Sequence, residues 1–141
     1  MTLGRTGGGG FSDSAEAYAA TMAPSVRVMA ERVVARAALG PGEAVLDVGT
    51  GTGTAAGLAR GGGRRIVGVD LAPGMLVIAR RELPELSWVE AAFEAMPFND
   101  GTFDVVLAVH ALLFATDPVA ALSEWRRVTR PGGRLSLSVP G

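Results

Sequence analysis

Runs rich in apolar residues alternate along the chain with stretches whose apolar residues recur at helical spacing. The apolar runs lie at residues 44–48, 65–70, 86–90, 103–109 and 134–139. Each run has the length of a strand in a parallel sheet, which is buried on both faces. Helices are expected at residues 54–60, 73–83 and 118–129. This alternation predicts an α/β fold, a three-layer sandwich in which helices cover both faces of a parallel sheet.

The first forty residues follow a different pattern. Residues 1–13 include four consecutive glycines, whose ordering costs backbone entropy, and we expect a flexible tail there. Further on, one helical stripe collects Val26, Met29, Ala30, Val33, Val34 and Ala37. Pro24 is expected to divide this segment into a short and a longer helix. The predicted organisation is a tail followed by one domain, 14–141, with leading helices at 14–40 and a core at 44–139.

The first apolar run ends in a glycine turn, Asp47-Val48-Gly49-Thr50-Gly51-Thr52-Gly53. Glycine adopts positive φ at little cost and lets a ligand lie against the backbone. In a parallel α/β sheet such a turn faces the crevice where ligands bind. The spacing G-x-G-x-G differs from the G-x-G-x-x-G fingerprint, which places a pyrophosphate on a helix N-terminus. The Asp47 carboxylate would repel a pyrophosphate but suits a ligand with an ammonium group and a second cationic centre.

A second acid follows at the distance that ribose recognition requires. The run Arg65-Ile66-Val67-Gly68-Val69 ends in Asp70, about 20 residues beyond the glycine turn. One carboxylate accepts hydrogen bonds from two neighbouring hydroxyl groups. Asp70 is therefore expected to bind ribose hydroxyls rather than a phosphate.

Five motifs follow one another along the chain. They are Val45 to Gly53; Gly68-Val69-Asp70 with Met75-Leu76; Phe93-Glu94-Ala95-Met96-Pro97-Phe98; Phe103-Asp104-Val105-Val106; and Arg130-Pro131-Gly132-Gly133-Arg134-Leu135. In this order they resemble the signature of class I S-adenosylmethionine-dependent methyltransferases, and most of all the type 11 kind that acts on small molecules. The resemblance implies a Rossmann-like sheet of strand order 3-2-1-4-5, S-adenosyl-L-methionine as cofactor, and methyl transfer to a small-molecule acceptor.

The resemblance also assigns the cofactor site. It implies that Asp47 holds the methionine ammonium, that Gly49, Gly51 and Gly53 allow close approach to the backbone, and that Asp70 binds the ribose. The further contacts that it implies are Thr50, Leu71, Met75, Ala92, Phe93 and Val109. Met75 would pack on the adenine, although a methionine on an apolar helix face is also compatible with a place in the core.

The chain departs from the family pattern in two places. Ala92 stands where many relatives carry an acid that accepts a hydrogen bond from the adenine amino group, which leaves adenine recognition to the Phe93 amide and to packing. The usual last two strands do not follow residue 139. The strand at 135–139 would then have an unpaired edge, and a homodimer through this edge is one expectation. A shortened form of a longer protein and a marginally stable domain are the alternatives.

Two residues are candidates for the acceptor side of the pocket. His110 follows the fourth strand at its ligand-facing end, where it is a candidate general base or acceptor contact, and an ordinary hydrogen-bonding role is the alternative. Tyr18 is a candidate lid residue, since the family's leading helices cover the pocket; a half-buried aromatic on a helix is the alternative. Asp104 lies at the opposite end of its strand and is expected to be structural. No other catalytic residue is assigned, because the cofactor supplies the reactive group.

Composition narrows the remaining choices. The 141 residues suffice for one domain, and 48% hydrophobic and 19% charged residues are typical of a soluble protein. The net charge is −1 and no basic patch indicates nucleic acid. With no cysteine and one histidine, neither a disulfide framework nor a metal site is expected. No secretory signal and no apolar run of roughly 18 residues is present, so a cytoplasmic protein without a membrane partner is expected.

Two other functions remain open from the sequence. A nicotinamide-dependent oxidoreductase shares the arrangement of strand, glycine turn, helix and acid, but Asp47, the tighter glycine spacing and the later motifs argue against it. A fragment that binds the cofactor and lacks an acceptor site is the second, because of the missing strands.

Overall fold

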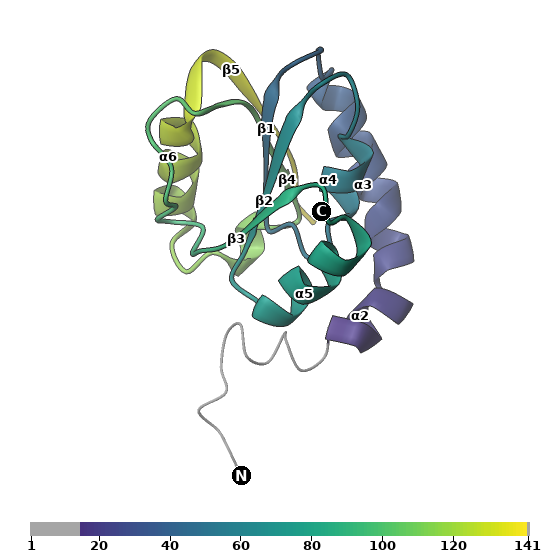
Figure 1. The fold of residues 1–141 in the computed structure, drawn as a ribbon. Coiled ribbons are helices and arrows are strands. Elements are labelled where there is room, and N and C mark those ends of the chain that lie inside the picture. The colour runs from purple at the N-terminus through teal and green to yellow at the C-terminus, as the bar shows by residue number, and fades with distance from the viewer. Residues whose placement is uncertain (1–14, 141) are drawn as a thin grey trace.

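The computed structural model describes residues 15–140, apart from the side chains of Tyr18, Ala19 and Ala23, and the predicted tail at 1–13 lies outside the described residues. Figure 1 shows a central sheet with helices on both sides. The elements are α2 (Ala15–Thr21), α3 (Ala23–Ala37), β1 (Ala44–Val48), α4 (Thr54–Leu58), β2 (Arg65–Asp70), α5 (Pro73–Glu82), β3 (Ser87–Glu90), β4 (Phe103–Val109), the 3-10 helix η1 (Leu112–Phe114), α6 (Pro118–Val128) and β5 (Thr129–Ser138).

All five strands run parallel in the order β3-β2-β1-β4-β5, which confirms the predicted α/β class and strand order. β1 lies at the centre of the sheet, and Val45 pairs with Ile66 of β2 on one side and Val105 of β4 on the other. The chain order reverses between β1 and β4. In open α/β sheets, ligands bind outside the carboxyl ends of the strands at this point.

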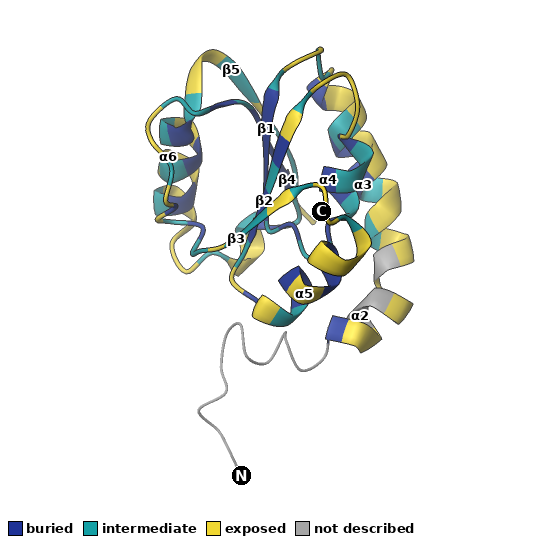
Figure 2. Ribbon diagram, viewed as in Figure 1, coloured by how far each residue is buried: buried dark blue, intermediate teal, exposed yellow. Residues whose placement is uncertain are grey.

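Successive side chains of the central strands point to opposite faces of the sheet and form two cores. One core joins Leu46 and Val48 of β1 to Trp125 of α6. The other joins Val45 of β1 to Val33 of α3 and packs against α4. In Figure 2 the buried colour follows the central strands and the inner sides of these helices. The arrangement is the predicted three-layer sandwich.

The helices lie where they are predicted, with ends shifted by a few residues. Pro24 lies in the first turn of α3, directly after α2. α3 ends at Ala37, and the next residue, Ala38, adopts a left-handed φ of +48°, two residues before the predicted stop at Gly40. Asp117 caps α6 by accepting hydrogen bonds from the backbone N–H groups of Val119 and Ala120, both at 3.1 Å. None of the helices among residues 15–140 is long and apolar enough to cross a membrane.

The last strand begins earlier than predicted. β5 starts at Thr129, which pairs with Phe103, whereas the apolar pattern predicts a start at residue 134. The pairing then shifts, so that residues 130–133 bulge opposite Asp104 before Arg134 pairs with Val105. Gly133 permits the bulge, because a Cβ there would lie 2.6 Å from the Asp104 carbonyl oxygen. The strand is extended by backbone pairing that the polar residues of this segment do not reveal.

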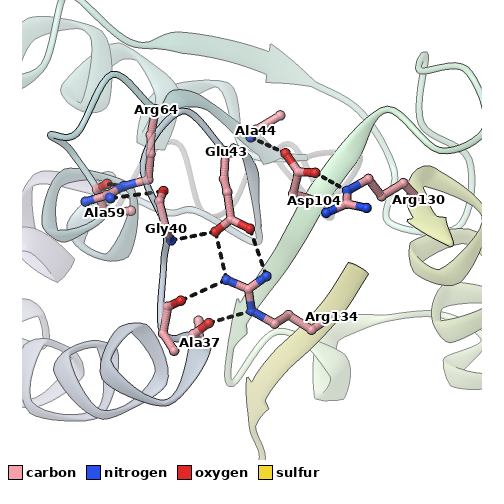
Figure 3. Close-up of polar contacts among 10 residues, drawn as sticks. Ala37, Gly40, Glu43, Ala44, Ala59, Arg64, Asp104, Arg130 and Arg134 are labelled. Carbon is pink, nitrogen blue, oxygen red and sulfur yellow. Dashed lines mark hydrogen bonds and ion pairs between the residues drawn. The ribbon is translucent and has the colours of Figure 1, made fainter. Parts of the chain in front are cut away.

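A cluster of charged side chains closes the end of the sheet where β1 and β4 begin (Figure 3). Arg134 donates to both carboxylate oxygens of Glu43, at 2.9 and 2.7 Å, and its Nε donates to the Ala37 carbonyl at 2.6 Å. The backbone N–H of Gly40 also donates to Glu43, at 2.7 Å. The bonds from Arg134 and Gly40 lower the pKa of Glu43 to about 2. β5, the end of α3 and the start of β1 are thereby joined.

Asp104 has the structural role expected of it. Its carboxylate accepts a hydrogen bond from the Ala44 backbone N–H at 2.7 Å and pairs with Arg130. These two contacts, in that order, lower the pKa of Asp104. The side chain thus holds the start of β1 against the start of β4, away from the carboxyl ends of the strands.

Candidate functional site

A cavity of about 380 Å³ lies at the carboxyl ends of β1, β2 and β4, within the range of small-molecule sites. All but one of the predicted cofactor contacts line it: Asp47, Gly49, Thr50, Gly51, Asp70, Leu71, Met75, Ala92, Phe93 and Val109. His110 lines the same cavity. The structure therefore brings residues from three of the five motifs to one place, together with Val109 and His110, and Gly53 is the exception.

Two glycines of the turn after β1 have different surroundings. Gly49 has a φ of +70°, and a Cβ there would lie 2.6 Å from the Ala111 Cβ, so close packing requires glycine. Gly51 has a φ of +57°, and a Cβ there would meet no atom within 4 Å. Backbone N–H groups of Gly49 and Thr50 donate to the Val69 carbonyl at 2.8 and 2.9 Å, which fixes the turn to β2. Gly51 thus leaves the backbone open to the cavity.

Asp47 is buried at the end of β1, with 1% of its surface exposed. The Thr50 hydroxyl donates to its Oδ2 at 2.7 Å. Burial raises the pKa of Asp47 to about 7, and the hydrogen bond from Thr50 opposes part of this shift. The carboxyl group is therefore balanced between its neutral and charged forms near neutral pH, and a nearby cation would favour the charged form.

Asp70 joins the ends of the first two strands. Its Oδ2 accepts a hydrogen bond from the Gly51 N–H at 2.8 Å, and its Oδ1 accepts one from the Ala72 N–H at 3.0 Å. Burial raises the pKa of Asp70, while the amides of Ala72 and Gly51 favour its charged form. Each oxygen keeps a second accepting position. The bond to Asp70 also gives the Ala72 N–H group a partner at the start of α5, where the alanine side chain makes no capping hydrogen bond.

The charges of the cavity favour a cation. Its described lining includes three carboxylates, those of Asp47, Asp70 and Glu94, and no lysine or arginine. A pyrophosphate would find no positive side chain there. A ligand with cationic groups and vicinal hydroxyls fits this donor set.

Gly53 does not line the cavity among its described residues. It has a φ of +90° at the start of α4, and a Cβ there would lie 2.7 Å from the Trp88 ring. Trp88 is itself held by a hydrogen bond from its Nε1 to the Leu83 carbonyl at 3.1 Å. Glycine is needed at position 53 for packing against β3, and its part in cofactor binding stays a prediction.

The adenine side of the predicted site combines buried and exposed residues. Met75 is buried against Ala72 and Ile78 and also lines the cavity, so its core and cavity interpretations are compatible. Leu71 is 47% exposed at the rim. Phe93 is buried, and its carbonyl accepts a hydrogen bond from Trp125 Nε1 at 3.1 Å, which fixes this wall to α6.

Of the two candidates for the acceptor side, the structure describes the side chain of His110 and not that of Tyr18. His110 lies directly after β4 and has a positive φ of +51°. Ser138 of β5 contacts both its backbone and its ring. The side chain of Tyr18 lies outside the described side chains.

Several lining residues were not predicted from the sequence: Val26, Ala30, Thr52, Thr54, Ala55, Ala72, Glu94, Ala111, Phe114 and Thr116. Val26 and Ala30 belong to the apolar stripe of α3, which has no signal that separates cavity from core. Phe114 and Thr116 follow the carboxyl end of β4, and the rule that ligands bind at these ends could have indicated them.

Comparison with known families gives one match over most of the chain. The sequence model of the family described as "Methyltransferase domain" matches residues 46–137. The matched segment runs from β1 to β5 and contains the glycine turn, Asp70 and His110.

Individual relatives agree with this match. The chain is 42% identical over 98 residues to a demethylmenaquinone methyltransferase of Beutenbergia cavernae, covering 70% of this chain and 41% of the relative. It is 37% identical over 128 residues to the malonyl-[acyl-carrier protein] O-methyltransferase of Serratia marcescens, covering 91% and 50%. A chain of the complex between the Haloferax volcanii Trm112 methyltransferase activator and a methyltransferase superposes with a TM-score of 0.85 at 31% identity, covering 92% and 59%. The chain thus spans about half the length of the curated relatives it matches.

Proposed function

We propose that this chain, which belongs to the class I S-adenosylmethionine-dependent methyltransferases, binds S-adenosyl-L-methionine in the cavity at the carboxyl ends of β1, β2 and β4. In this proposal it transfers the methyl group of the cofactor to a small-molecule acceptor. The observation that carries this proposal is the pairing of a glycine turn with two carboxylates in a cavity whose described lining has no lysine or arginine. The cofactor carries an ammonium group, a sulfonium and two ribose hydroxyls, which match these carboxylates.

Each residue has a defined part in the proposal. Asp70 accepts from the ribose hydroxyls with the free positions of its two oxygens. Asp47 offsets the positive charge of the methionine ammonium. Gly51 leaves room for the ligand against the backbone, while Ala92 and Phe93 border the adenine. The cofactor, when bound, supplies a methyl group on a cationic sulfur, and the bond between them breaks with both electrons remaining on sulfur. The protein contributes chiefly by positioning the acceptor in line with that bond.

The leading helices are part of the same domain in this proposal. Val26 and Ala30 of α3 line the cavity, so the segment 14–40 contributes to the site as well as to the core. We therefore assign residues 14–141 to one methyltransferase domain.

The test is calorimetric titration of the full chain with S-adenosylhomocysteine, with NADH in parallel. Micromolar binding of S-adenosylhomocysteine and none of NADH is expected, and Asp70→Ala should weaken that binding. Asp100→Ala is the matched control, because the Asp100 side chain is 83% exposed and lies outside the cavity. Equal binding of both ligands would favour the oxidoreductase alternative, and no binding by the folded chain would contradict the proposal.

Turnover requires a separate assay, because a fragment that only holds the cofactor would pass the binding test. The chain should convert S-adenosylmethionine to S-adenosylhomocysteine in the presence of phenols, quinols or amines. The two relatives act on demethylmenaquinone and on malonyl-[acyl-carrier protein], according to their names, so a quinol and a carboxylate acceptor belong in the panel. Binding without turnover on any of these acceptors would favour the fragment alternative.

The edge of β5 is the surface proposed for a homodimer. Among the described residues β5 pairs only with β4, and Leu135 and Val139 are 40% and 53% exposed near this edge. An open edge with apolar neighbours is a template for strand pairing. Light scattering at high protein concentration should show a dimer, and a clean monomer would contradict it.

A further inference from the structure

His110 is held in an unfavourable backbone conformation at the wall of the cavity. Its φ of +51° lies in the left-handed region, which costs free energy for residues other than glycine, although histidine adopts it more often than most of them. The backbone N–H of His110 donates to the carbonyl oxygen and to the hydroxyl of Ser138, both at 3.1 Å. Such strain persists only where the surroundings hold it, and here β5 holds it from the neighbouring strand.

The same hydroxyl also fixes the ring. Ser138 Oγ lies 3.0 Å from His110 Nδ1. Because Oγ already accepts from the backbone N–H, its own proton is free to donate, and Nδ1 is its acceptor among the described residues. In the tautomer in which Oγ donates to Nδ1, that nitrogen carries no proton and the ring proton is on Nε2. The contact between Oγ and Nδ1 fits this tautomer.

His110 differs in its donor from the other described side chains of the cavity, whose donors are threonine hydroxyl groups. It is the only described lining residue whose side chain contains a nitrogen atom. The carboxylates of Asp47, Asp70 and Glu94 accept hydrogen bonds and repel anions. An acceptor with a negative oxygen therefore has one side-chain nitrogen donor available among the described lining residues, at the end of β4.

We propose that His110, oriented by Ser138, donates a hydrogen bond from Nε2 to an oxygen of the methyl acceptor, and that the acceptors are phenolates or enolates rather than amines. This inference rests on the proposed methyltransferase function. Ser138 is a positioning residue, since it acts through the ring of His110.

The chemistry needs no proton transfer to the protein. The acceptor loses its acidic proton to water and binds as the oxyanion, whose charge the Nε2–H group stabilises. Its oxygen, or the carbon conjugated to it, forms the new bond to the methyl carbon, while the electron pair of the broken C–S bond remains on sulfur. The imidazole is neutral before and after the step.

The single histidine of the chain makes this inference testable without turnover. Nitrogen-15 NMR of the full chain, saturated with S-adenosylhomocysteine, reports the protonation of both ring nitrogens. We expect the proton on Nε2, a hydrogen-bonded Nδ1, and a shift of the Nε2–H resonance when 4-nitrophenolate is added. The matched control is 4-nitroaniline, which has the same shape and an amine in place of the oxyanion, and it should leave the resonance unchanged.

Variants of Ser138 distinguish a role in positioning His110 from a role in folding. Wild type should bind 4-nitrophenolate at least tenfold more tightly than 4-nitroaniline, Ser138→Ala should lose this preference, and Ser138→Thr should retain it, because threonine keeps the hydroxyl. A proton on Nδ1 in the wild type, or an Nε2–H resonance that 4-nitrophenolate does not shift, would overturn the inference even if Ser138→Ala does not fold. Failure to bind S-adenosylhomocysteine would instead count against the proposed function itself.

Discussion

Arg134 of β5 and Glu43, the residue before β1, form a two-point ion pair in which Nη1 lies 2.9 Å from Oε2 and Nη2 lies 2.7 Å from Oε1. The same guanidinium donates from Nε to the Ala37 carbonyl and from Nη2 to the Ala38 carbonyl, at 2.6 and 2.9 Å. The Arg134 side chain therefore joins its own strand, β5, to carbonyl groups at the end of α3 and to the Glu43 carboxylate beside β1.

Replacement of Arg134 should destabilise the fold without changing the site. Arg134→Ala leaves the Glu43 carboxylate and two helix-end carbonyls without this partner, and we expect the free energy of unfolding to fall by about 2 kcal/mol. Urea denaturation measures the change. Arg134→Lys should recover only part of it, because an ammonium lacks the planar geometry of two parallel bonds. Arg126→Ala, at an exposed position of α6, is the control, and an equal loss in both alanine variants would contradict this role.

Asp47 should make the stability depend on pH. The folded carboxyl group keeps its proton to a pKa of about 7, whereas the unfolded one releases it near 3.8. The native state binds more protons between these values, so stability falls as pH rises from about 4 to 7. Relative to Asp47→Asn, the wild type should lose about 1.4 kcal/mol per pH unit at most in this range. Urea denaturation from pH 5 to 8 measures it, and a constant difference between the two proteins would refute the burial argument.

Asp70 should contribute to cofactor affinity through hydrogen bonds to two hydroxyls. Asp70→Asn removes the charge and offers only one accepting oxygen, although Gly51 and Ala72 both donate to this side chain. We expect the affinity for S-adenosylhomocysteine to fall about 10- to 100-fold, equivalent to about 1.5–3 kcal/mol. Isothermal titration calorimetry measures it. An unchanged affinity would show that the ribose lies elsewhere.

Alanine substitutions at Gly51 and Gly53 should lower the stability of the fold by different amounts. Gly53→Ala combines a φ of +90° with a clash against Trp88, and we expect a loss of about 2–4 kcal/mol in stability. Gly51→Ala meets no protein atom within 4 Å and should cost about 1–2 kcal/mol from its φ of +57° alone.

Ligand binding completes this comparison. The methyl group of Gly51→Ala would occupy space beside the ligand, so the affinity for S-adenosylhomocysteine should fall at least tenfold, while folded Gly53→Ala should bind nearly as the wild type does. Thermal unfolding and calorimetry on the same samples test both, and the reverse order of the two effects would contradict the assignment.

Ala92→Asp should tighten cofactor binding. Ala92 lines the cavity beside Phe93, and an aspartate there would accept a hydrogen bond from the adenine amino group, as the resemblance to the family implies. A bond to a charged group contributes about 1.5 kcal/mol, or roughly a tenfold gain in affinity. Ala92→Asn, with a neutral acceptor, should gain less. If calorimetry finds no gain in either variant, adenine does not lie beside residue 92.

The strands could be predicted from the sequence because their signals are local, whereas their order was implied by the resemblance to the family. A buried parallel strand is a short apolar run, and the glycine turn after β1 marks which end faces the ligand. The early start of β5 could not be predicted in this way. Its first residues are held by pairing with Phe103 and by a bulge at Asp104, and neither contact changes the apolar pattern of the segment.

The residues of the site, like the strands, could be predicted where the signal is local and not where it depends on distant contacts. The carboxylates of Asp47 and Asp70 were recognisable because charged residues at the ends of apolar runs are unusual. The packing of Gly53 against Trp88 could not be predicted, because Trp88 is distant in sequence. Val26 was missed because one apolar face of α3 serves the core and the cavity together.

The charged cluster of Figure 3 and the cavity lie at opposite ends of the same strands. Glu43 and Asp104 hold the amino ends of β1 and β4, and neither contributes to the cavity. Over evolutionary time, substitutions at the lining residues Phe114 and Thr116 can therefore reshape the cavity while the contacts that secure the strands persist. Such a separation lets new specificities arise by drift in a few loop positions, without a compensating gain in stability elsewhere.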